Sequence, residues 1–299
     1  MSKHVVSVSL GSSSRNHRVC LQLLGEEVTV ERVGTDGDRH RLISEIQKLD
    51  GLVDAFGLGG IDRFIYVNDR RYAFREAEAI ARHARYTPIL DGSGLKNSLE
   101  RDVVLRLADD PRVRLRGKRV LLVSGADRFG MAAALVEIGC TVVFGDLMFG
   151  LGVPVPLRSL SALNRVAKLV APLITQLPIR YLYPTGEKQE AITERYAEHY
   201  LAAEVIAGDF HFIRRHLPER LEGKTILTNT VTPADVELLR ARGVGQLITT
   251  TPNLEGRSFG TNVMEALLVA LSGASCELAA EAYLSGLSRI GFEPRIESI

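Results

Sequence analysis

The sequence predicts an α/β protein with two domains: an N-terminal α/β domain and a Rossmann-type domain with a doubly wound parallel sheet. Three observations predict this class. Short apolar runs with strand character alternate with amphipathic segments along the chain. Residues 117–146 form a strand, a glycine turn, a helix and a second strand that ends in an acid. A break at Asp109-Asp110-Pro111 ends a helical segment, because proline restricts the preceding residue. The predicted domains are residues 1–110 and 111–273, and residues 274–299 can pack back on the first.

In the first domain, strands and helices are expected to alternate. The expected strands are residues 4–10, 27–33, 52–57, 63–67, 71–74 and 88–90, with a hairpin turn at Asn68-Asp69. The expected helices are residues 38–49, 75–85 and 95–107. Glycine-rich loops at residues 34–38 and 57–62 follow two of the strands, and they could line a cleft or serve as ordinary tight turns.

In the second domain, six strands separated by helices predict the doubly wound sheet. The expected strands are residues 120–124, a strand that ends at Asp146, and residues 179–183, 205–207, 225–228 and 246–250. The expected helices are one after the glycine turn and residues 159–175, 188–203, 233–242 and 262–272, with a last helix from Glu277.

Composition excludes several classes of function. The 37 basic and 36 acidic residues give a net charge of +1, so no field attracts nucleic acid or a membrane surface. The three cysteines are far apart and show no C-x-x-C spacing, so neither disulfides nor a zinc site are expected. No run reaches the ~18 apolar residues of a membrane span. We therefore expect a cytoplasmic protein with a small-molecule substrate and no metal; a homodimer is left open.

A nucleotide site is predicted at the glycine turn, residues 125–130. Gly125 allows the turn, Gly130 lets the helix start close to the strand, and the free amides would face a phosphate. The predicted cofactor-binding residues are Gly125, Ala126, Asp127, Arg128, Phe129, Gly130 and Asp146, which follows Gly125 by 21 residues and would accept ribose hydroxyls. Asp127 replaces the usual middle glycine, which costs about 1 kcal/mol or more unless Arg128 screens its charge. The alternative is a β-α-β unit without a ligand.

Polar residues also follow three strands of the predicted sheet. Thr228, Asn229 and Thr230 are assigned to the cofactor site, and Gly208-Asp209 and residues 249–251 stand in equivalent positions. Ligands of such sheets bind outside the carboxyl ends of the strands, so these residues would face one crevice. Ordinary turn chemistry accounts for the same residue types.

The segment Asp91-Gly-Ser-Gly-Leu-Lys-Asn-Ser-Leu99 resembles the T-D-G-x-G-F-x-x-S-L segment of shikimate and quinate dehydrogenases. A weaker similarity joins Ser12-Ser-Ser-Arg-Asn-His17 to that family's S-x-S-P-x-x-H-N loop. The resemblance implies that Asp91 is the catalytic aspartate, that Ser12 and Ser14 bind the substrate carboxylate, and that the glycine turn binds the cofactor. The family's N-V-T-x-P-x-K lysine is missing, because no lysine occurs between Lys48 and Lys96.

Oxidation of an alcohol needs a group that takes its proton. Lys96, five residues after Asp91, and His17, beside the serines, are the candidate catalytic groups; each could instead be a solvated surface residue. The leading hypothesis is an oxidoreductase that acts on a hydroxylated carboxylic acid such as quinate or shikimate. NAD is favoured over NADP, since Asp146 would repel a 2′-phosphate. The alternatives are an S-adenosylmethionine transferase, which Asp127 favours, and a metabolite-binding protein without catalysis.

Overall fold

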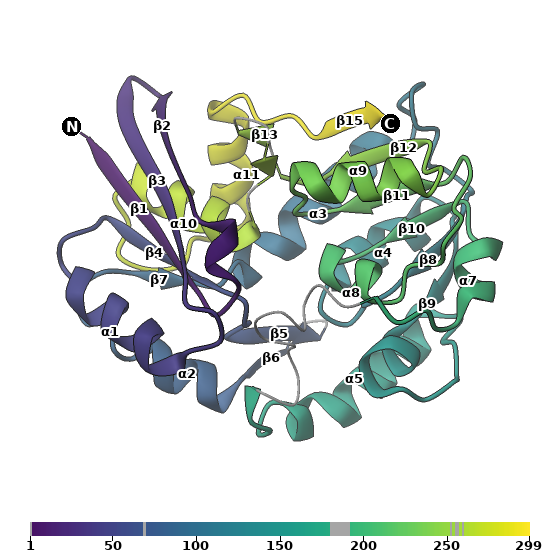
Figure 1. The fold of residues 1–299 in the computed structure, drawn as a ribbon, viewed down its shortest axis with the longest axis horizontal. Helices are drawn as coiled ribbons and strands as arrows, with labels where there is room; N and C mark the ends of the chain where they lie inside the picture. Colours follow the sequence, from purple (N-terminus) through teal and green to yellow (C-terminus); the bar gives the residue numbers. More distant parts are fainter. Residues whose placement is uncertain (1, 68–69, 180–191, 252, 255–256, 259) are drawn as a thin grey trace.

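The computed structural model describes residues 2–67, 70–179, 192–251, 253–254, 257–258 and 260–299, and it confirms the α/β class (Figure 1). Within these residues, five strands form a first sheet in the order β2-β3-β1-β4-β7. Strands β3, β1, β4 and β7 are parallel, and β2 is antiparallel to β3. The elements are β1 (Lys3–Ser9), η1 (Ser13–Arg15), β2 (His17–Leu23), β3 (Glu26–Gly34), α1 (Arg39–Leu49), β4 (Ala55–Gly59), β5 (Phe64–Val67), β6 (Arg70–Ala73), α2 (Arg75–Ala81) and β7 (Ile89–Leu90).

The second sheet has the order β15-β12-β11-β10-β8-β9 in the described part of the chain. Its strands are parallel except β15, which is antiparallel to β12. The elements are α3 (Ser93–Leu107), β8 (Arg119–Leu122), α4 (Phe129–Glu137), β9 (Thr141–Phe144), η2 (Asp146–Gly150), α5 (Leu160–Ile174), α7 (Ala197–Ala202), β10 (Val205–Ala207), α8 (Phe210–Arg215), β11 (Thr225–Thr228), α9 (Pro233–Ala241), β12 (Gln246–Thr249), β13 (Asn253–Leu254), β14 (Arg257–Ser258), α10 (Thr261–Ser272), α11 (Ala280–Arg289) and β15 (Arg295–Ser298).

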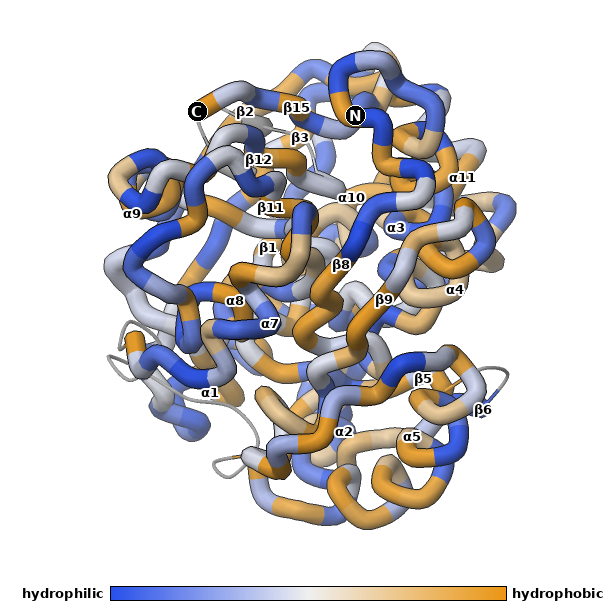
Figure 2. The backbone as a smooth tube through the Cα atoms, turned by 90° about the vertical axis from the view of Figure 1, so that its right-hand side faces the viewer, coloured by the Kyte–Doolittle hydropathy of each residue, from blue (hydrophilic) through white to orange (hydrophobic). Residues whose placement is uncertain are grey.

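Continuous apolar runs form the parallel strands, because helices cover such strands on both faces. In β8, Val120, Leu121 and Leu122 are all buried, and Figure 2 shows hydrophobic stretches along β8 and β9. Val120 and Leu122 contribute to one core cluster while Leu121 contributes to another. The strand therefore anchors helices on both sides of the sheet.

Two helices join the two halves of the molecule, the first half being built on the first sheet and the second half on the second sheet. Helix α10, which the sequence assigns to the second domain, packs on β1 and β4 of the first sheet, and it also contacts α3. Helix α3 packs in turn on α4 and α11. One apolar cluster accordingly runs through both halves, from Val5 and Val30 through Leu267 to Val120. The domain boundaries at residues 110 and 273 stay a prediction.

Several expected elements need correction. Strand β2 was not expected, nor were α8 and β15, which supplies the sixth strand of the second sheet. The expected helix 188–203 is helical only from Ala197, and residues 192–196 carry no regular structure; Ile179, expected in a strand, is helical. The turn at residues 68–69 and the stretches 180–183 and 188–191 lie outside the described residues. No helix in the described ranges has the length and apolar character to cross a bilayer.

Candidate functional site

A cavity of about 180 Å³ lies where the two sheets face each other. In the first sheet, β1 has β3 on one side and β4 on the other; in the second, β8 lies between β9 and β10. Such a reversal of strand order opens a crevice at the carboxyl ends of the strands. The loops after β1, β4, β8 and β10 all reach the cavity, which therefore lies at the reversal points of both sheets. Its charged, histidine and amide lining residues are Arg15, Arg32, Asp62, Asp91, Lys96, Asp127, Arg128, Asp209, His211, Arg215, Asn229 and Asn262.

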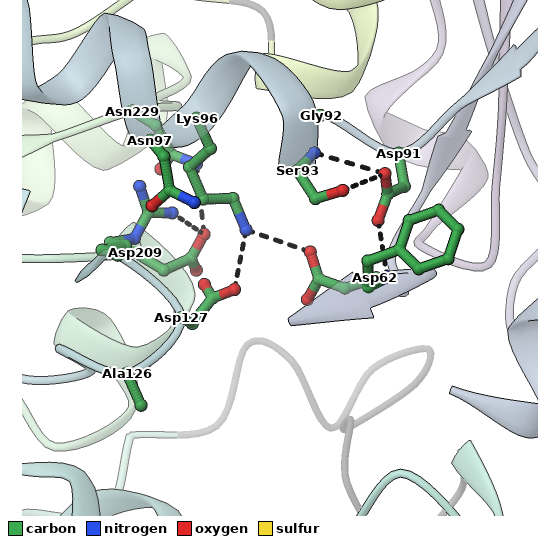
Figure 3. A network of polar contacts seen from close by, with 12 residues as sticks. Asp62, Asp91, Gly92, Ser93, Lys96, Asn97, Ala126, Asp127, Asp209 and Asn229 are labelled. Carbon is green, nitrogen blue, oxygen red and sulfur yellow. Dashed lines mark hydrogen bonds and ion pairs between the residues drawn. The ribbon is translucent and has the colours of Figure 1, made fainter. Parts of the chain in front are cut away.

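Lys96 lies between the two halves, as Figure 3 shows. Its ammonium Nζ lies 2.8 Å from Asp127 Oδ1, in the loop after β8, and 3.1 Å from Asp62 Oδ1, in the loop after β4. The Lys96 residue is 4% exposed. Burial disfavours its charge, but the carboxylates of Asp127 and Asp62 outweigh that effect and raise the pKa of Lys96. Lys96 is therefore a fixed hydrogen-bond donor, and it is not the solvated surface residue that the sequence left open.

Arg128 is buried beside this lysine. Its guanidinium pairs with Glu100, one turn after Lys96 on α3, and with Asp209 Oδ2 at 3.1 Å. Asp209 also accepts a hydrogen bond from Asn229 Nδ2 at 3.2 Å. Burial raises the pKa of Asp209, but the positive charge of Arg128 outweighs it and lowers that pKa to about 2. Asp127 is thus paired with Lys96. Arg128, which was expected to screen Asp127, pairs with Glu100 and Asp209 instead.

Asp91 lines the cavity, but its carboxylate accepts hydrogen bonds from backbone amides. Its Oδ2 accepts hydrogen bonds from the amides of Arg63 at 2.6 Å and Phe64 at 3.1 Å, and its Oδ1 accepts one from Ser93 Oγ at 2.7 Å. Gly92 follows with a φ of +92°, and an added Cβ there would clash with the backbone of Thr261 and Asn262. The contacts of Asp91 thus join the start of α3 to the backbone of Arg63 and Phe64, while Gly92 lets it lie close to α10.

The predicted carboxylate-binding serines are outside the cavity lining. Ser12 and Ser14 hydroxyls are 2.8 Å apart, and Ser12 Oγ caps the short helix η1. His17 begins β2 and is likewise absent from the described lining. Ser7 and Ser9, two residues apart on the same face of β1, line the cavity instead.

The hydroxyls of β1 are held by side chains of other elements. Ser7 Oγ accepts a hydrogen bond from Asn262 Nδ2 at 2.9 Å, and Ser9 Oγ accepts one from Arg32 Nη2 at 3.0 Å. Both serines are nearly fully buried. The polar wall of the first half is therefore built from β1, β3 and α10.

The glycine turn is closed by the protein's own side chains. Asp146 Oδ2 accepts a hydrogen bond from the amide of Gly125 at 3.0 Å, and its Oδ1 accepts one from Ala126 at 2.7 Å. Burial raises the pKa of Asp146 to about 6, against the lowering effect of the two amides. The carboxylate thus takes the place that a phosphate would take at the start of α4.

The other end of the turn is also filled. The amide of Gly130 donates to Asn97 Oδ1 at 3.1 Å, and a Cβ on Gly130 would overlap the Asn97 carbonyl. Gly130 thus lets α4 approach α3, not the strand as expected, and Phe129 packs into the core. Because these amides are occupied, the residues of the turn do not fit the diphosphate of a dinucleotide in this arrangement.

The strand-end residues of β11 divide between two roles. Asn229 and Thr230 line the cavity. Thr228 is fully buried and donates its hydroxyl to the carbonyl of Gly208 at 2.8 Å, so it ties β11 to β10.

The structure thus brings together six predicted site residues: Asp91, Lys96, Asp127, Arg128, Asn229 and Thr230. It keeps nine others off the described lining: Ser12, Ser14, His17, Gly125, Ala126, Phe129, Gly130, Asp146 and Thr228. Five sets of lining residues were not among the predicted site residues: Arg15, Arg32, His211, Arg215 and the serines of β1. In the described ranges, no group of three His, Cys, Asp or Glu side chains is placed to hold a metal ion.

Two family models match the chain: one described as "Domain of unknown function (DUF8753)" over residues 4–91 and one described as "Domain of unknown function (DUF8754)" over residues 94–299. The chain belongs to the DUF8754 family. No curated protein matches it. The two models meet between Asp91 and Gly94, so the DUF8754 region begins at the first turn of α3 and includes Lys96.

Solved structures resemble this DUF8754 protein at low identity. A sugar ABC transport substrate-binding protein from Bordetella parapertussis shares 11% identity at a TM-score of 0.39, covering 99% of this chain and 89% of that chain. The malic enzyme of Entamoeba histolytica shares 12% at 0.40, covering 95% and 61%. L-tryptophan dehydrogenase from Nostoc punctiforme shares 11% at 0.39, covering 97% and 79%. At these TM-scores the similarity carries no conclusion about activity.

Proposed function

We propose that this protein is an enzyme that binds a small hydroxylated anion in the cavity and holds one of its oxygens by a hydrogen bond from the Lys96 ammonium. The observation that carries the proposal is the position of Lys96 between Asp62 and Asp127, at the reversal points of both sheets. An ammonium group has three N–H donors. Two of them have partners among the described residues, so the third can bind a ligand oxygen.

The lining favours an anionic ligand with hydroxyl groups. Arg15 and Arg32 come from the first half and Arg215 from the second. Guanidinium groups suit carboxylate and phosphate, while serine and asparagine side chains suit hydroxyls. The volume is below the roughly 300–1,000 Å³ of pockets for drug-sized ligands, which favours a molecule of about one ring. A hydroxylated carboxylic acid such as quinate or shikimate, the class that the Asp91 segment suggests, meets both requirements.

Calorimetry with quinate and with uncharged myo-inositol tests this proposal. We expect quinate to bind and myo-inositol to bind at least tenfold more weakly. Arg32→Gln should weaken quinate binding roughly tenfold or more, since a hydrogen bond to a charged group contributes about 1.5–3 kcal/mol. Arg240→Gln, on the exposed face of α9, is the matched control. Equal binding of the two rings, or no binding of either, refutes the proposal.

A second candidate is the nicotinamide-dependent oxidoreductase. The order β8, glycine turn, α4, β9 and Asp146 has formed as its sequence pattern predicts. Binding of NAD requires Asp146 to exchange the two turn amides for ribose hydroxyls. We expect Asp146→Asn to abolish any binding of NADH that the wild-type chain shows, while leaving quinate binding intact.

A ligand panel of NADH, NADPH and S-adenosylmethionine separates the remaining hypotheses. Fluorescence titration detects the two nicotinamide cofactors, and calorimetry detects the third. Binding of S-adenosylmethionine alone favours the transferase. No response to any of the three dismisses both cofactor hypotheses, and quinate binding without turnover leaves a metabolite-binding protein.

A further inference from the structure

Arg15, from the first half, and His211 and Arg215, from the second, are three basic residues that we refer to as the basic cluster. Arg15 is the last residue of η1, and its Nη1 lies 2.8 Å from His211 Nε2. His211 and Arg215 are four residues apart on α8, a spacing that puts them on one helical face. All three line the cavity. The cluster therefore spans the gap between the sheets.

The contact fixes the protonation state of His211. A guanidinium can only donate, so Nε2 must accept, and the imidazole is neutral with its proton on Nδ1. Burial and then the charge of Arg15 lower the pKa of His211 to about 4. The carboxylates of Asp209, before α8, and Asp235, on α9, act in the opposite direction, and Arg214, on α8 itself, acts with Arg15.

The ring of His211 has few restraints besides Arg15. Its Nδ1 is buried and has no hydrogen-bond partner within the described stretches of the chain. The ring can therefore turn when a ligand offers a better acceptor to Arg15, since it loses no other side-chain hydrogen bond. A neutral imidazole is a poorer acceptor for Arg15 than an oxyanion, which forms a charge-assisted hydrogen bond to the guanidinium.

We propose that the oxyanion group of the ligand binds in the basic cluster between Arg15 and α8, displaces His211 as the acceptor of Arg15, and converts the imidazole to a protonated donor. This inference rests on the proposed function, since it assigns the anionic end of the same ligand. One proton enters from solvent for each ligand bound. No covalent step is involved, and Lys96 remains with the hydroxylated part of the ligand.

The test is calorimetry on the full chain at pH 6, 7 and 8, in pairs of buffers with different ionisation enthalpies. Quinate is the carboxylate probe and sulfate stands in for a phosphate group; neither changes charge in this range. We expect affinity to fall by up to tenfold per pH unit as pH rises, and the binding enthalpy to depend on the buffer. If quinate binding depends on pH and buffer in this way, the basic cluster binds a carboxylate. If only sulfate binding does so, the cluster binds a phosphate-type group.

Two variants locate the proton. His211→Gln keeps a neutral acceptor for Arg15, so the fold is retained, and we expect binding to weaken and to lose its dependence on both pH and buffer. His40→Gln, on the exposed face of α1, should keep both dependences. The inference is overturned if an anion binds with the same affinity from pH 6 to 8, or if His211→Gln matches the wild-type chain. Absence of all anion binding instead overturns the proposed function together with this site.

Discussion

Replacing Arg128 by methionine tests whether the charges beneath the cavity hold the fold together. Arg128 is 1% exposed and Glu100 is 0% exposed, so their ion pair is inaccessible to water. Removing one partner of a buried pair leaves an uncompensated charge, which costs about 3–5 kcal/mol. For a 299-residue chain, this loss lowers the melting temperature by roughly 5–8 °C, taking an unfolding entropy of about 2.1 cal/mol/K per residue.

The loss should depend on pH in a defined direction. Burial raises the pKa of Glu100 even beside Arg128 and Lys96, and without the guanidinium it rises further. A carboxyl whose folded pKa exceeds its unfolded value destabilises the fold as pH rises, because the unfolded chain releases its proton first. The loss in free energy of unfolding caused by Arg128→Met should therefore become smaller when the pH is lowered from 7 towards 5.

Urea unfolding monitored by circular dichroism measures these differences. The matched control is Arg101→Met, which removes a partly exposed ion pair between α3 and α4, that of Arg101 with Glu137. We expect that control to lose less than about 1 kcal/mol. The double variant Arg128→Met, Glu100→Met should be more stable than Arg128→Met alone, since the fully buried charge of Glu100 is removed with its partner. A loss under 1 kcal/mol for Arg128→Met, or no recovery in the double variant, refutes the reasoning.

Three further predictions follow from close contacts and shifted pKa values. Gly130→Ala should destabilise the fold by more than 2 kcal/mol, because its Cβ would meet the Asn97 backbone, whereas Gly150→Ala, with open space around it, should cost under 1 kcal/mol in the same urea titration. The carboxyl carbon of Asp146 should titrate near pH 6 by NMR, and a midpoint below 4 would contradict its burial. Burial raises the pKa of Glu265 to about 8, so its contribution to stability should fall as pH rises from about 4.5 to 8, and Glu265→Gln should flatten that part of the stability profile.

The layered fold could be predicted because buried parallel strands are continuous apolar runs. Strands β10 and β11 occupy the residues that the sequence predicted. Strand β2 was missed because its alternating pattern, with an exposed arginine and cysteine, gives no continuous run at this sheet edge. Strand β15 was missed for a similar reason, since its residues are at most partly buried.

The cavity could be predicted only in part. The strand-end rule indicated Asn229 and Thr230, since it depends on topology alone. The ion pairs of Lys96 could not be predicted from the sequence, because they depend on how α3 packs against two loops. Asp62 lies 34 residues before Lys96, and Asp127 lies 31 residues after it. Asp146 shows the same limit. Its position after β9 was predicted, but the sequence does not reveal that its carboxylate would bind the amides of Gly125 and Ala126.

The order of charges on α3 indicates to which half of the molecule the helix is more firmly attached. Lys96 and Glu100, one turn apart, face Asp127 and Arg128, which are consecutive in the loop after β8, so each charge meets its opposite. With the pair of Arg101 and Glu137, three ion pairs among the described residues join α3 to the second half, whereas Asp62 offers it a single one from the first. An opening motion of the cavity that kept α3 with the second sheet would break the contact of Lys96 with Asp62 and leave its contact with Asp127. The Lys96 ammonium would then move with the second half, and closure on a ligand would restore the second carboxylate that holds its charge.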